Sequence, residues 1–454
     1  MIGLGVRLGW KIGPLEALAR WPRGQRVLML HSGRLHPRWS RYSILAQPAG
    51  AYRFDLTGPH QGQSRWIGSG TNQPPDLPPI ANWSHRLFND LDAVLAADPD
   101  AMWIGYLAYD AGRLIERLPT QAAADRSWPI AQMHRCPGWL VHDSLERAWY
   151  ACGTWRNGGV PNLPDLPLSA GHFHAQAPHS DWTPQSYQAA VERTKAYIAA
   201  GDVFQVNLAQ RFTASCTGDP RRLYLALASA SPAWYGAYLE LEPADADEPQ
   251  RVIASASPEL FLEVQPSGCV ITRPIKGTRP ATALPQELLA SEKDAAELNM
   301  IVDLLRNDLG RVCAYGTVQV AQAREIESHP TVHHGVATIR GQLHPSKTLA
   351  DLLRATMPGG SITGAPKVRA MQIIDELEPV RRGPYCGAAG YVHGKQACFN
   401  IIIRTLLIET GPDGAGRVDF SVGGGIVADS DPASEYQETL DKAAALRAAL
   451  EQAT

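Results

Sequence analysis

The sequence lacks the features that mark membrane and nucleic-acid-binding proteins. No apolar run reaches the roughly 18 residues that a membrane-spanning helix needs. Residues 1–7 lack the charged-then-apolar order of a secretory signal. The net charge is only −3 at pH 7, which provides no broad basic field for phosphates. We therefore expect a cytoplasmic protein that binds neither a membrane nor nucleic acid.

Cysteine is also scarce and scattered. The seven cysteines form no Cys-x-x-Cys pair, so neither a disulfide framework nor a zinc knuckle is indicated. Hydrophobic residues make up 44% and charged residues 19% of the 454 residues. This balance is typical of a globular chain with a sizeable core, and two subdomains that share one core are expected.

Proline marks a boundary in the chain. Residues 158–182 hold Pro161, Pro164, Pro167 and Pro178 and predict a linker. Short alternating runs at 26–31 and 102–107 predict strands before it. After it, apolar residues at helical spacing predict helices over 184–200, 295–312, 366–377 and 432–450. Runs rich in β-forming residues at 251–256, 399–405 and 418–422 predict strands of a large sheet.

One predicted helix carries Glu435, Glu438 and Lys442 at positions i, i+3 and i+7, which places them on one face. Such a face can hold a divalent cation and an anion, or it can be a solvated stripe of salt bridges. Three consecutive glycines, residues 423–425, precede the helix and let a ligand approach the backbone closely. Glu297, near the start of another predicted helix, is a surface residue, a charge that favours the helix dipole, or a cation ligand.

Residues 359–367 read Gly-Gly-Ser-Ile-Thr-Gly-Ala-Pro-Lys, which is typical of an anion-binding turn at a helix start. The turn is not a Walker A loop, because Ala365 and Pro366 separate the last glycine from Lys367. Lys276 lies between an apolar residue and a glycine, so it is either a surface lysine or one whose pKa desolvation lowers. His334 can equally be a core histidine or a substrate contact.

The order of these motifs along the chain resembles the chorismate-binding enzyme family. The resemblance covers about residues 183–450 and extends more loosely to 30–33 and 39–42 in the first half. The motifs, in order, are Ser257-Pro258-Glu259, Ile275-Lys276-Gly277-Thr278, Glu297, Arg306-Asn307-Asp308, residues 361–367, Ile403-Arg404-Thr405, and Glu435 to Lys442. The resemblance implies an α+β fold, a large two-subdomain sandwich of mostly antiparallel sheets flanked by helices. Residues 1–157 would form its amino-terminal region and residues 183–454 its chorismate-binding catalytic region.

Two positions separate the branches of this family. Lys276 stands where aminodeoxychorismate synthases carry a lysine that attacks chorismate and where anthranilate synthases have alanine. Gln205 stands where isochorismate and salicylate synthases carry the lysine that activates water, and a neutral amide cannot serve as that base. The resemblance therefore implies formation of 4-amino-4-deoxychorismate on the route to para-aminobenzoate and folate. The alternatives are an anthranilate synthase and a non-catalytic relative that binds tryptophan or a partner.

The resemblance also implies roles for single residues. Lys276 would be the nucleophile, and Glu259 would protonate the departing hydroxyl. Glu297 and Glu438 would hold Mg²⁺, with Glu435 close by or acting through water. The substrate carboxylates would be held by Tyr385, Arg404, Gly423, Gly424, Gly425 and Lys442. The ring pocket would be lined by Gly277, Thr278, His334 and Thr363. The run 329–331 and Gly335 depart from the more apolar pattern of the family around His334.

Two partners follow from the same resemblance. The sequence holds no candidate cysteine nucleophile for splitting glutamine, so ammonia would come from a separate glutamine amidotransferase subunit. A pocket in the first half would hold tryptophan, and the alternative is a packed seam between the subdomains. Its expected lining is Ser32, Trp39, Ser40, Arg41, Tyr42, Trp234, Tyr235 and Gly236.

Overall fold

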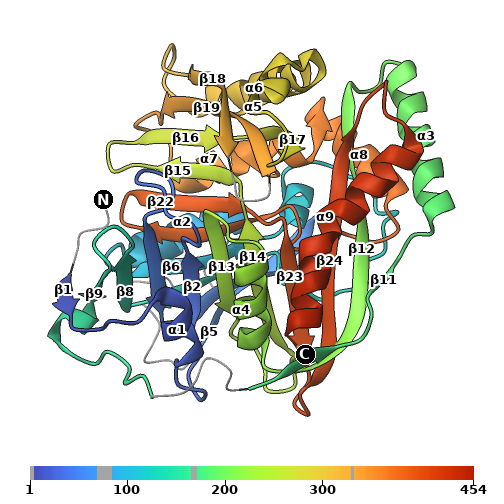
Figure 1. Ribbon diagram of the computed structural model, residues 1–454. Coiled ribbons are helices and arrows are strands. Elements are labelled where there is room, and N and C mark those ends of the chain that lie inside the picture. The colour runs from blue at the N-terminus through green and yellow to red at the C-terminus, as the bar shows by residue number, and fades with distance from the viewer. Residues whose placement is uncertain (1–4, 69–83, 165–170, 329–331, 454) are drawn as a thin grey trace.

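Two large antiparallel sheets form the centre of the molecule. The computed structural model describes residues 5–68, 84–164, 171–328 and 332–453. Within these residues, a 13-stranded sheet has the order β1-β9-β8-β3-β2-β13-β14-β23-β24-β12-β10, with β11 and β20 also paired to β12. An 11-stranded sheet has the order β17-β19-β16-β15-β22-β21-β6-β7-β4-β5, with β18 paired to β19. The predicted fold class, mostly antiparallel sheets flanked by helices, is confirmed (Figure 1).

The bounds of the strands are as follows. The 13-stranded sheet contains β1 (Val6–Leu8), β2 (Leu28–His31), β3 (Tyr42–Ala46), β8 (Gly138–Asp143), β9 (Ala148–Gly153), β10 (Phe173–Ala175), β11 (His179–Ser180), β12 (Gln205–Gly218), β13 (Tyr235–Glu240), β14 (Gln250–Ser257), β20 (Gly364–Ala365), β23 (Thr405–Thr410) and β24 (Ala415–Ile426). The 11-stranded sheet contains β4 (Ala51–Gly58), β5 (Gln61–Ile67), β6 (Met102–Leu107), β7 (Ala131–Cys136), β15 (Leu260–Val264), β16 (Cys269–Arg273), β17 (Ile275–Pro280), β18 (Gln319–Ser328), β19 (Val332–Gln342), β21 (Ala388–His393) and β22 (Gln396–Ile401).

Both halves of the sequence contribute to both sheets. From the region 1–157, β2 pairs with β13 and β6 pairs with β21, so strands far apart in the chain are neighbours in space. The predicted linker 158–182 is partly structured, since β10 and β11 within it pair with β12. The boundaries 1–157, 158–182 and 183–454 remain a sequence prediction, and the two regions are joined strand by strand.

The four predicted helices are present. They are α3 (Pro184–Ala199), α6 (Glu292–Gly310), α8 (Lys367–Leu377) and α9 (Pro432–Gln452). The Thr183 side chain accepts a hydrogen bond from the backbone of Ser186 and caps α3, while Asp431 caps α9 in the same way. The other helices are α1 (Pro14–Ala19), α2 (Leu87–Ala97), α4 (Pro220–Ala230), α5 (Pro285–Ala290) and α7 (Leu349–Thr356), with the 3₁₀ turns η3 (Tyr109–Leu114), η4 (Thr154–Asn157) and η5 (Gly360–Ile362).

The prediction of a single strand over 399–405 is wrong, because the chain changes from one sheet to the other within this run. The chain leaves the 11-stranded sheet at Ile401, at the end of β22, and enters the 13-stranded sheet at Thr405, at the start of β23. Arg404 between them has φ +51, a left-handed conformation that a continuous strand does not contain. The apolar run therefore hides a crossover between the two sheets.

A second crossover lies beside the first. The chain passes from β14 in the 13-stranded sheet to β15 in the 11-stranded sheet through Pro258 and Glu259. The backbones of the two crossovers hydrogen bond to each other, from Ala256 N to Arg404 O at 3.0 Å and from Ile401 N to Glu259 O at 3.1 Å. Glu259 and Arg404 thus lie together at the seam between the sheets.

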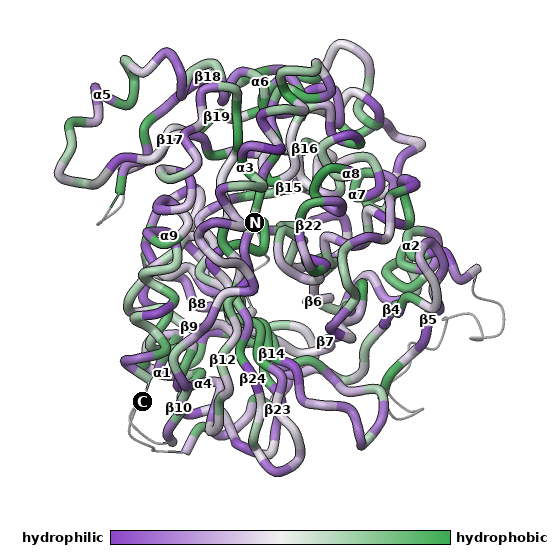
Figure 2. Tube along the Cα trace, turned by 90° about the vertical axis from the view of Figure 1, so that its right-hand side faces the viewer, coloured by the Kyte–Doolittle hydropathy of each residue, from purple (hydrophilic) through white to green (hydrophobic). Residues whose placement is uncertain are grey.

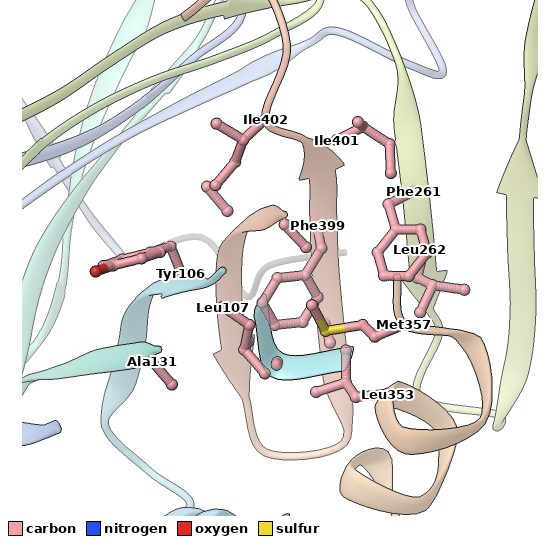
Figure 3. Packing of buried hydrophobic residues seen from close by; sticks show 14 of the residues in the cluster. Tyr106, Leu107, Ala131, Phe261, Leu262, Leu353, Met357, Phe399, Ile401 and Ile402 are labelled. Atoms are coloured by element: carbon pink, nitrogen blue, oxygen red, sulfur yellow. The ribbon is translucent and has the colours of Figure 1, made fainter. Parts of the chain in front are cut away.

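One apolar core fills the space between the sheets and continues under α2, α6 and α7. In it, Phe399 of β22 lies near Leu107 of β6 and near Met357, which follows α7 (Figure 3). A second core lies between the 13-stranded sheet and the helices α1, α4 and α9, where Phe212 and Phe420 stack at 5.1 Å. These cores hold the seam between two rigid layers.

Two expectations from the sequence concern membrane-spanning helices and the cysteines. Of the helices in the described residues, none is both long enough and apolar enough to cross a membrane. All seven cysteines are free, and five of them are buried. The segment that carries α5 projects from the body of the molecule between β17 and α6 (Figure 2).

Candidate active site

The glycines of β24 are the point on which the predicted charged residues converge. A Cβ built on Gly424 would lie 3.1 Å from Glu435 Oε2, 3.7 Å from Glu438 Oε1 and 3.9 Å from Lys442 Nζ. A Cβ built on Gly425 would lie 3.1 Å from Lys276 Nζ and 2.6 Å from Gln205 Nε2. Because successive residues of a strand face opposite sides of the sheet, the missing side chain of Gly424 leaves room for polar groups of α9, and that of Gly425 leaves room for those of β17 and β12.

Burial moves Lys276 and Glu259 toward their neutral forms. Desolvation lowers the pKa of Lys276, although the nearby Glu297 carboxylate opposes this shift. Desolvation also raises the pKa of Glu259 to about 7, against the opposing effects of Ser361 and Lys276. At neutral pH a large share of Glu259 therefore carries a proton, and Lys276 is closer to a free amine than an exposed lysine would be.

The carboxyl of Glu259 is held by a residue that had no predicted role. The hydroxyl of Ser361, in η5, donates to Glu259 Oε1 at 2.6 Å, and both side chains are buried. In the sequence, the only indication of this contact is the hydroxyl that follows the glycine pair at 359–360. Its partner is about a hundred residues away, and only the fold brings the two side chains together.

Two of the three predicted cation ligands, Glu435 and Glu438, lie beside Gly424, and the third, Glu297, interacts electrostatically with Lys276 and Glu438. Glu435 is buried, accepts a hydrogen bond from Ser430 at 2.6 Å through Oε1, and has a raised pKa because it is desolvated. Glu438 is exposed and pairs with Lys442 at 2.6 Å, which holds its pKa below the usual value although desolvation opposes this. Desolvation raises the pKa of the half-buried Glu297. Among the described residues no three His, Cys, Asp or Glu side chains form a ready-made metal cluster.

His334, Thr278 and Arg404 form a linked set on one side of the site. Thr278 Oγ1 lies 2.9 Å from His334 Nδ1, and Arg404 Nη2 lies 3.5 Å from His334 Nε2. A guanidinium can only donate, so Nε2 accepts and Nδ1 donates to Thr278. Gly277 precedes Thr278 with φ +79, and a Cβ there would lie 2.8 Å from Leu288, so glycine is needed for this turn.

The turn 359–367 binds protein groups with most of its polar atoms. Lys367 Nζ donates to Asp308 Oδ2 at 2.5 Å and to Thr356 O at 3.0 Å, so its charge is neutralised within the fold. Thr363 is fully buried and its hydroxyl donates to Gly359 O at 2.9 Å. Within the motif Arg306-Asn307-Asp308, Asp308 is therefore the residue that joins α6 to α8.

Tyr385 is connected to this turn through Arg382. Its ring centroid is 5.8 Å from the Arg382 guanidinium carbon, and the residue is buried. Arg382 donates to Ile362 O at 2.9 Å and to Asn207 O at 2.7 Å, which fastens η5 to β12. The described contacts thus connect Tyr385 to the frame of the site through Arg382.

Two buried polar side chains of β12 have unused hydrogen-bonding atoms. Both amide atoms of Gln205 and Oδ1 of Asn207 have no partner among the described residues. Gln205 is fully buried, and its Nε2 faces Gly425 beside Lys276. Buried polar atoms without partners are costly in a protein interior, so such atoms indicate a site built for a ligand.

A separate cavity of about 670 Å³ is lined by residues of β2, β3 and β13 of the 13-stranded sheet and of β15, β21 and β22 of the 11-stranded sheet. It is lined by seven of the eight residues of the predicted tryptophan pocket, namely Ser32, Trp39, Arg41, Tyr42, Trp234, Tyr235 and Gly236. Ser40 is buried instead, with its hydroxyl donating to Trp234 O at 3.2 Å. The Trp39 ring lies between the guanidinium groups of Arg38 and Arg273, at 4.3 and 4.1 Å.

A buried acid, a desolvated lysine and a carboxylate-bearing helix at the seam of a two-sheet sandwich are features of an enzyme site, and comparison with known proteins shows its family. The sequence profile of the family described as chorismate binding enzyme matches residues 60–448, so the chain belongs to that family and acts on chorismate.

Individual members of the family are similar to this chain over most of its length. Aminodeoxychorismate synthase component 1 of Klebsiella aerogenes is 40% identical over 364 residues, covering 75% of each chain. The protein of that name from Escherichia coli (strain K12) is 41% identical over 371 residues, covering 75% of this chain and 74% of that one. The crystal structure of anthranilate synthase component I from Streptococcus pneumoniae TIGR4 matches with a TM-score of 0.70 at 29% identity, covering 97% of this chain and 99% of that one.

Proposed function

We propose that the protein is component 1 of an aminodeoxychorismate synthase, which converts chorismate and ammonia to 4-amino-4-deoxychorismate. The observation that carries the proposal is the amine of Lys276, which faces Gly425 beside the acidic face of α9. The names of the relatives from Klebsiella aerogenes and Escherichia coli support this branch. The anthranilate synthase likeness keeps that enzyme as the alternative.

The chemistry divides a difficult substitution into two steps. The Lys276 amine forms a bond to ring C2, the ring double bonds shift, and the C4–O bond breaks as Glu259 protonates the departing hydroxyl to water. Ammonia then forms a bond to C4 and the shifting double bonds expel the lysine amine from C2. A pKa of about 7 suits Glu259 to this transfer, because the acid must be protonated at neutral pH and release its proton readily.

The carboxylates of α6 and α9 suit a hard cation. Glu297 from α6 and Glu438 and Glu435 from α9 offer oxygen donors, which are the ligands that Mg²⁺ prefers. When bound, Mg²⁺ would neutralise a substrate carboxylate. Arg404 and Lys442 add positive charge to the site, and Lys442 Nζ is fixed by its bond to Gly423 O at 2.8 Å. These groups orient the ring against Lys276.

Ammonia would come from a glutamine amidotransferase partner. The designation component 1 in the relatives supports a second component. In the proposed reaction the partner releases ammonia close to C4, and free ammonium salts replace it at high concentration.

Product analysis tests the proposal directly. The purified protein is incubated with chorismate, Mg²⁺ and an ammonium salt, and the product is identified by mass and chromatography. We expect 4-amino-4-deoxychorismate, and anthranilate with pyruvate as the product would favour the alternative. Without ammonia, the wild type should form a covalent adduct on the peptide that contains Lys276, and Lys276→Ala should form none. A Lys276→Ala variant with full activity would contradict the lysine mechanism.

A second binding function is proposed for the cavity of about 670 Å³, which we assign to tryptophan. Aromatic and cationic side chains around Trp39 and Tyr42 suit an indole ring, which stacks well on such groups. L-Tryptophan should raise the melting temperature, since a ligand that binds only the native state stabilises it. Glycine controls for the amino and carboxylate groups, and the absence of any shift at high tryptophan concentration would contradict the assignment.

A further inference from the structure

The hydroxyl of Ser361 makes one of the shortest polar contacts of the buried seam, and the proposed reaction assigns it no role. It donates to Glu259 Oε1 at 2.6 Å. Ser361 is 7% exposed and Glu259 is 5% exposed, so water has little access to either. Hydrogen bonds of a hydroxyl to a carboxylate in such surroundings are strong and directional.

The turn that carries Ser361 is held on all sides. A Cβ on Gly359 would lie 2.9 Å from Ile401 Cδ1, and a Cβ on Gly360 would lie 2.8 Å from Leu304 Cδ2, so the backbone fits closely against β22 and α6. The turn is also tied by the bond from Thr363 to Gly359 O and by that from Arg382 to Ile362 O. The turn therefore fixes both the position and the direction of the Ser361 hydroxyl.

We propose that Ser361 is a positioning residue that binds Oε1 of Glu259, so that the acidic proton is carried by the other oxygen, Oε2, and is aimed at the departing hydroxyl. The inference rests on the proposed role of Glu259 as the proton donor. A carboxyl that could rotate would present its proton in several directions, and only one of them protonates the leaving group.

The charged and titratable groups around Glu259 set how its protonation responds. Burial is the main cause of its raised pKa, and the rise is opposed by the Ser361 hydroxyl, Lys276 from β17, a backbone hydrogen bond of Ile275, and Arg404 from the β22–β23 crossover. The thiol of Cys386 also faces it, with its own pKa raised by burial to about 12, so it stays uncharged at neutral pH. The Ser361 bond favours the ionised form as well. Loss of the hydroxyl should thus make Glu259 more protonated at neutral pH and yet less effective.

A Glu259 that is more protonated and yet less effective distinguishes a positioning role of Ser361 from a packing role. In Ser361→Ala, the titration of Glu259 should move to higher pH by about one unit. It is followed by the infrared band of the protonated carboxyl, which is identified by its loss in Glu259→Gln. Chorismate consumption should fall about 10- to 100-fold even at low pH, where the acid is fully protonated. Ser361→Thr keeps the hydroxyl and should restore both quantities.

The matched control is Thr356→Val. Thr356 is a buried residue near the same turn whose hydroxyl donates to Leu352 O at 2.8 Å, so its loss should change neither quantity. An unchanged carboxyl titration in Ser361→Ala, or equal effects in the control, would overturn the proposal. If the alanine variant fails to fold, Ser361→Cys offers a similar volume with a weaker donor and the same two readouts. If the wild type consumes no chorismate, the proposed function fails, while the infrared titration still decides whether Ser361 controls Glu259.

Discussion

Glu259 and Lys276 show at the scale of single residues how burial alone prepares groups for chemistry. Each loses the hydration of its charged form, and the pKa of Glu259 rises while that of Lys276 falls. Both shifts favour the neutral form of the group concerned. The fold therefore holds an acid and an amine close together without committing them to a salt bridge.

Glu259→Gln should make the protein more stable at alkaline pH. The carboxyl has a pKa of 4.5 in its ordinary state and about 7 in the folded protein, so the native state binds the proton more tightly. Its contribution to stability is lost as the pH rises from 4.5 to 7, by about 3 kcal/mol when fully ionised. Urea unfolding at pH 8 should show a Gln variant that is more stable than the wild type, with little difference at pH 4. The exposed Glu287→Gln is the control, and a difference that does not depend on pH would contradict the assignment.

Gln205→Met should separate stability from function. The buried amide of Gln205 has no partner among the described residues. Its replacement by an apolar side chain of similar length should increase the free energy of unfolding by about 1 to 3 kcal/mol. Chorismate turnover should decrease, since the amide faces Gly425 beside the Lys276 amine. Unchanged turnover together with lower stability would show that the amide serves the fold rather than the site.

At the scale of elements, α9 combines two roles on adjacent faces. Thr439, Ala443 and Leu446 are buried, and the helix packs on β24 between α3 and α4 (Figure 1). Glu438 and Lys442 lie at the exposed edge of the same helix. A helix that is fixed by its apolar face carries its charged face to one position, and this rigidity suits a site for metal and carboxylate ligands.

Glu438→Gln and Glu297→Gln should each reduce turnover strongly and raise the Mg²⁺ concentration that is needed for half-maximal rate. A neutral amide is a poorer ligand for a hard cation than a carboxylate. The measurement is the rate of chorismate consumption as a function of Mg²⁺. Glu451→Gln, at the exposed end of the same helix, should leave that dependence unchanged. Near-normal rates at low Mg²⁺ in either site variant would place the metal elsewhere.

The Asp308–Lys367 pair joins α6 to α8 and should be important for stability. Both side chains are largely buried, so removal of one partner leaves a buried charge. Asp308→Asn and Lys367→Met should each cost about 3 to 5 kcal/mol, and the double variant should cost much less than their sum. The exposed pair Asp303–Arg306 provides the control, with an expected effect below about 1 kcal/mol. Additive losses in the double variant would contradict a direct interaction.

Local sequence patterns predicted both helices and strands, and the one strand that was wrong has a physical reason. The caps and apolar spacing of α3 and α9 are local, and the structure has both helices where the pattern placed them. The run 399–405 looked like one strand, because nothing in its side chains reveals the positive φ of Arg404 at a crossover. The order of motifs predicted Glu259 and Lys276 as site residues, whereas the bond from Ser361 to Glu259 depends on a turn and a crossover far apart in sequence.

At the scale of the whole molecule, a chain of ion pairs links the two sheets. It starts on β4 of the 11-stranded sheet and ends on β12 of the 13-stranded sheet, through Asp55, Arg53, Glu248, Arg251, Glu409, Arg417, Asp419, Arg126, Asp125 and Arg211. Networks of partly buried pairs are more effective than isolated surface pairs. This one ties together sheets whose strands come from distant parts of the chain.

Glu248→Gln should weaken the protein at neutral pH but not in acid. Although desolvation alone would raise it, the pKa of Glu248 is lowered to about 2, chiefly by its hydrogen bond from Arg53. Its stabilisation is present above pH 4.5 and is lost as the pH falls toward 2. After solvent screening, the cost at pH 7 should be about 1 to 2 kcal/mol. Chemical unfolding at pH 7 and pH 3 checks this, with Asp303→Asn in the exposed pair Asp303–Arg306 as control. An equal difference at both pH values would contradict it.

The pairing of β2 with β13 and of β6 with β21 has a consequence for the protein as it is synthesised. While the ribosome is still adding later residues, the early strands have open edges and no partner to cover them. Glu259 and Arg404 meet only once the second crossover has been made, because their backbones bond to each other's crossover. The seam between the sheets therefore forms only after residues 401–405 have been synthesised, and until then the open strand edges can aggregate.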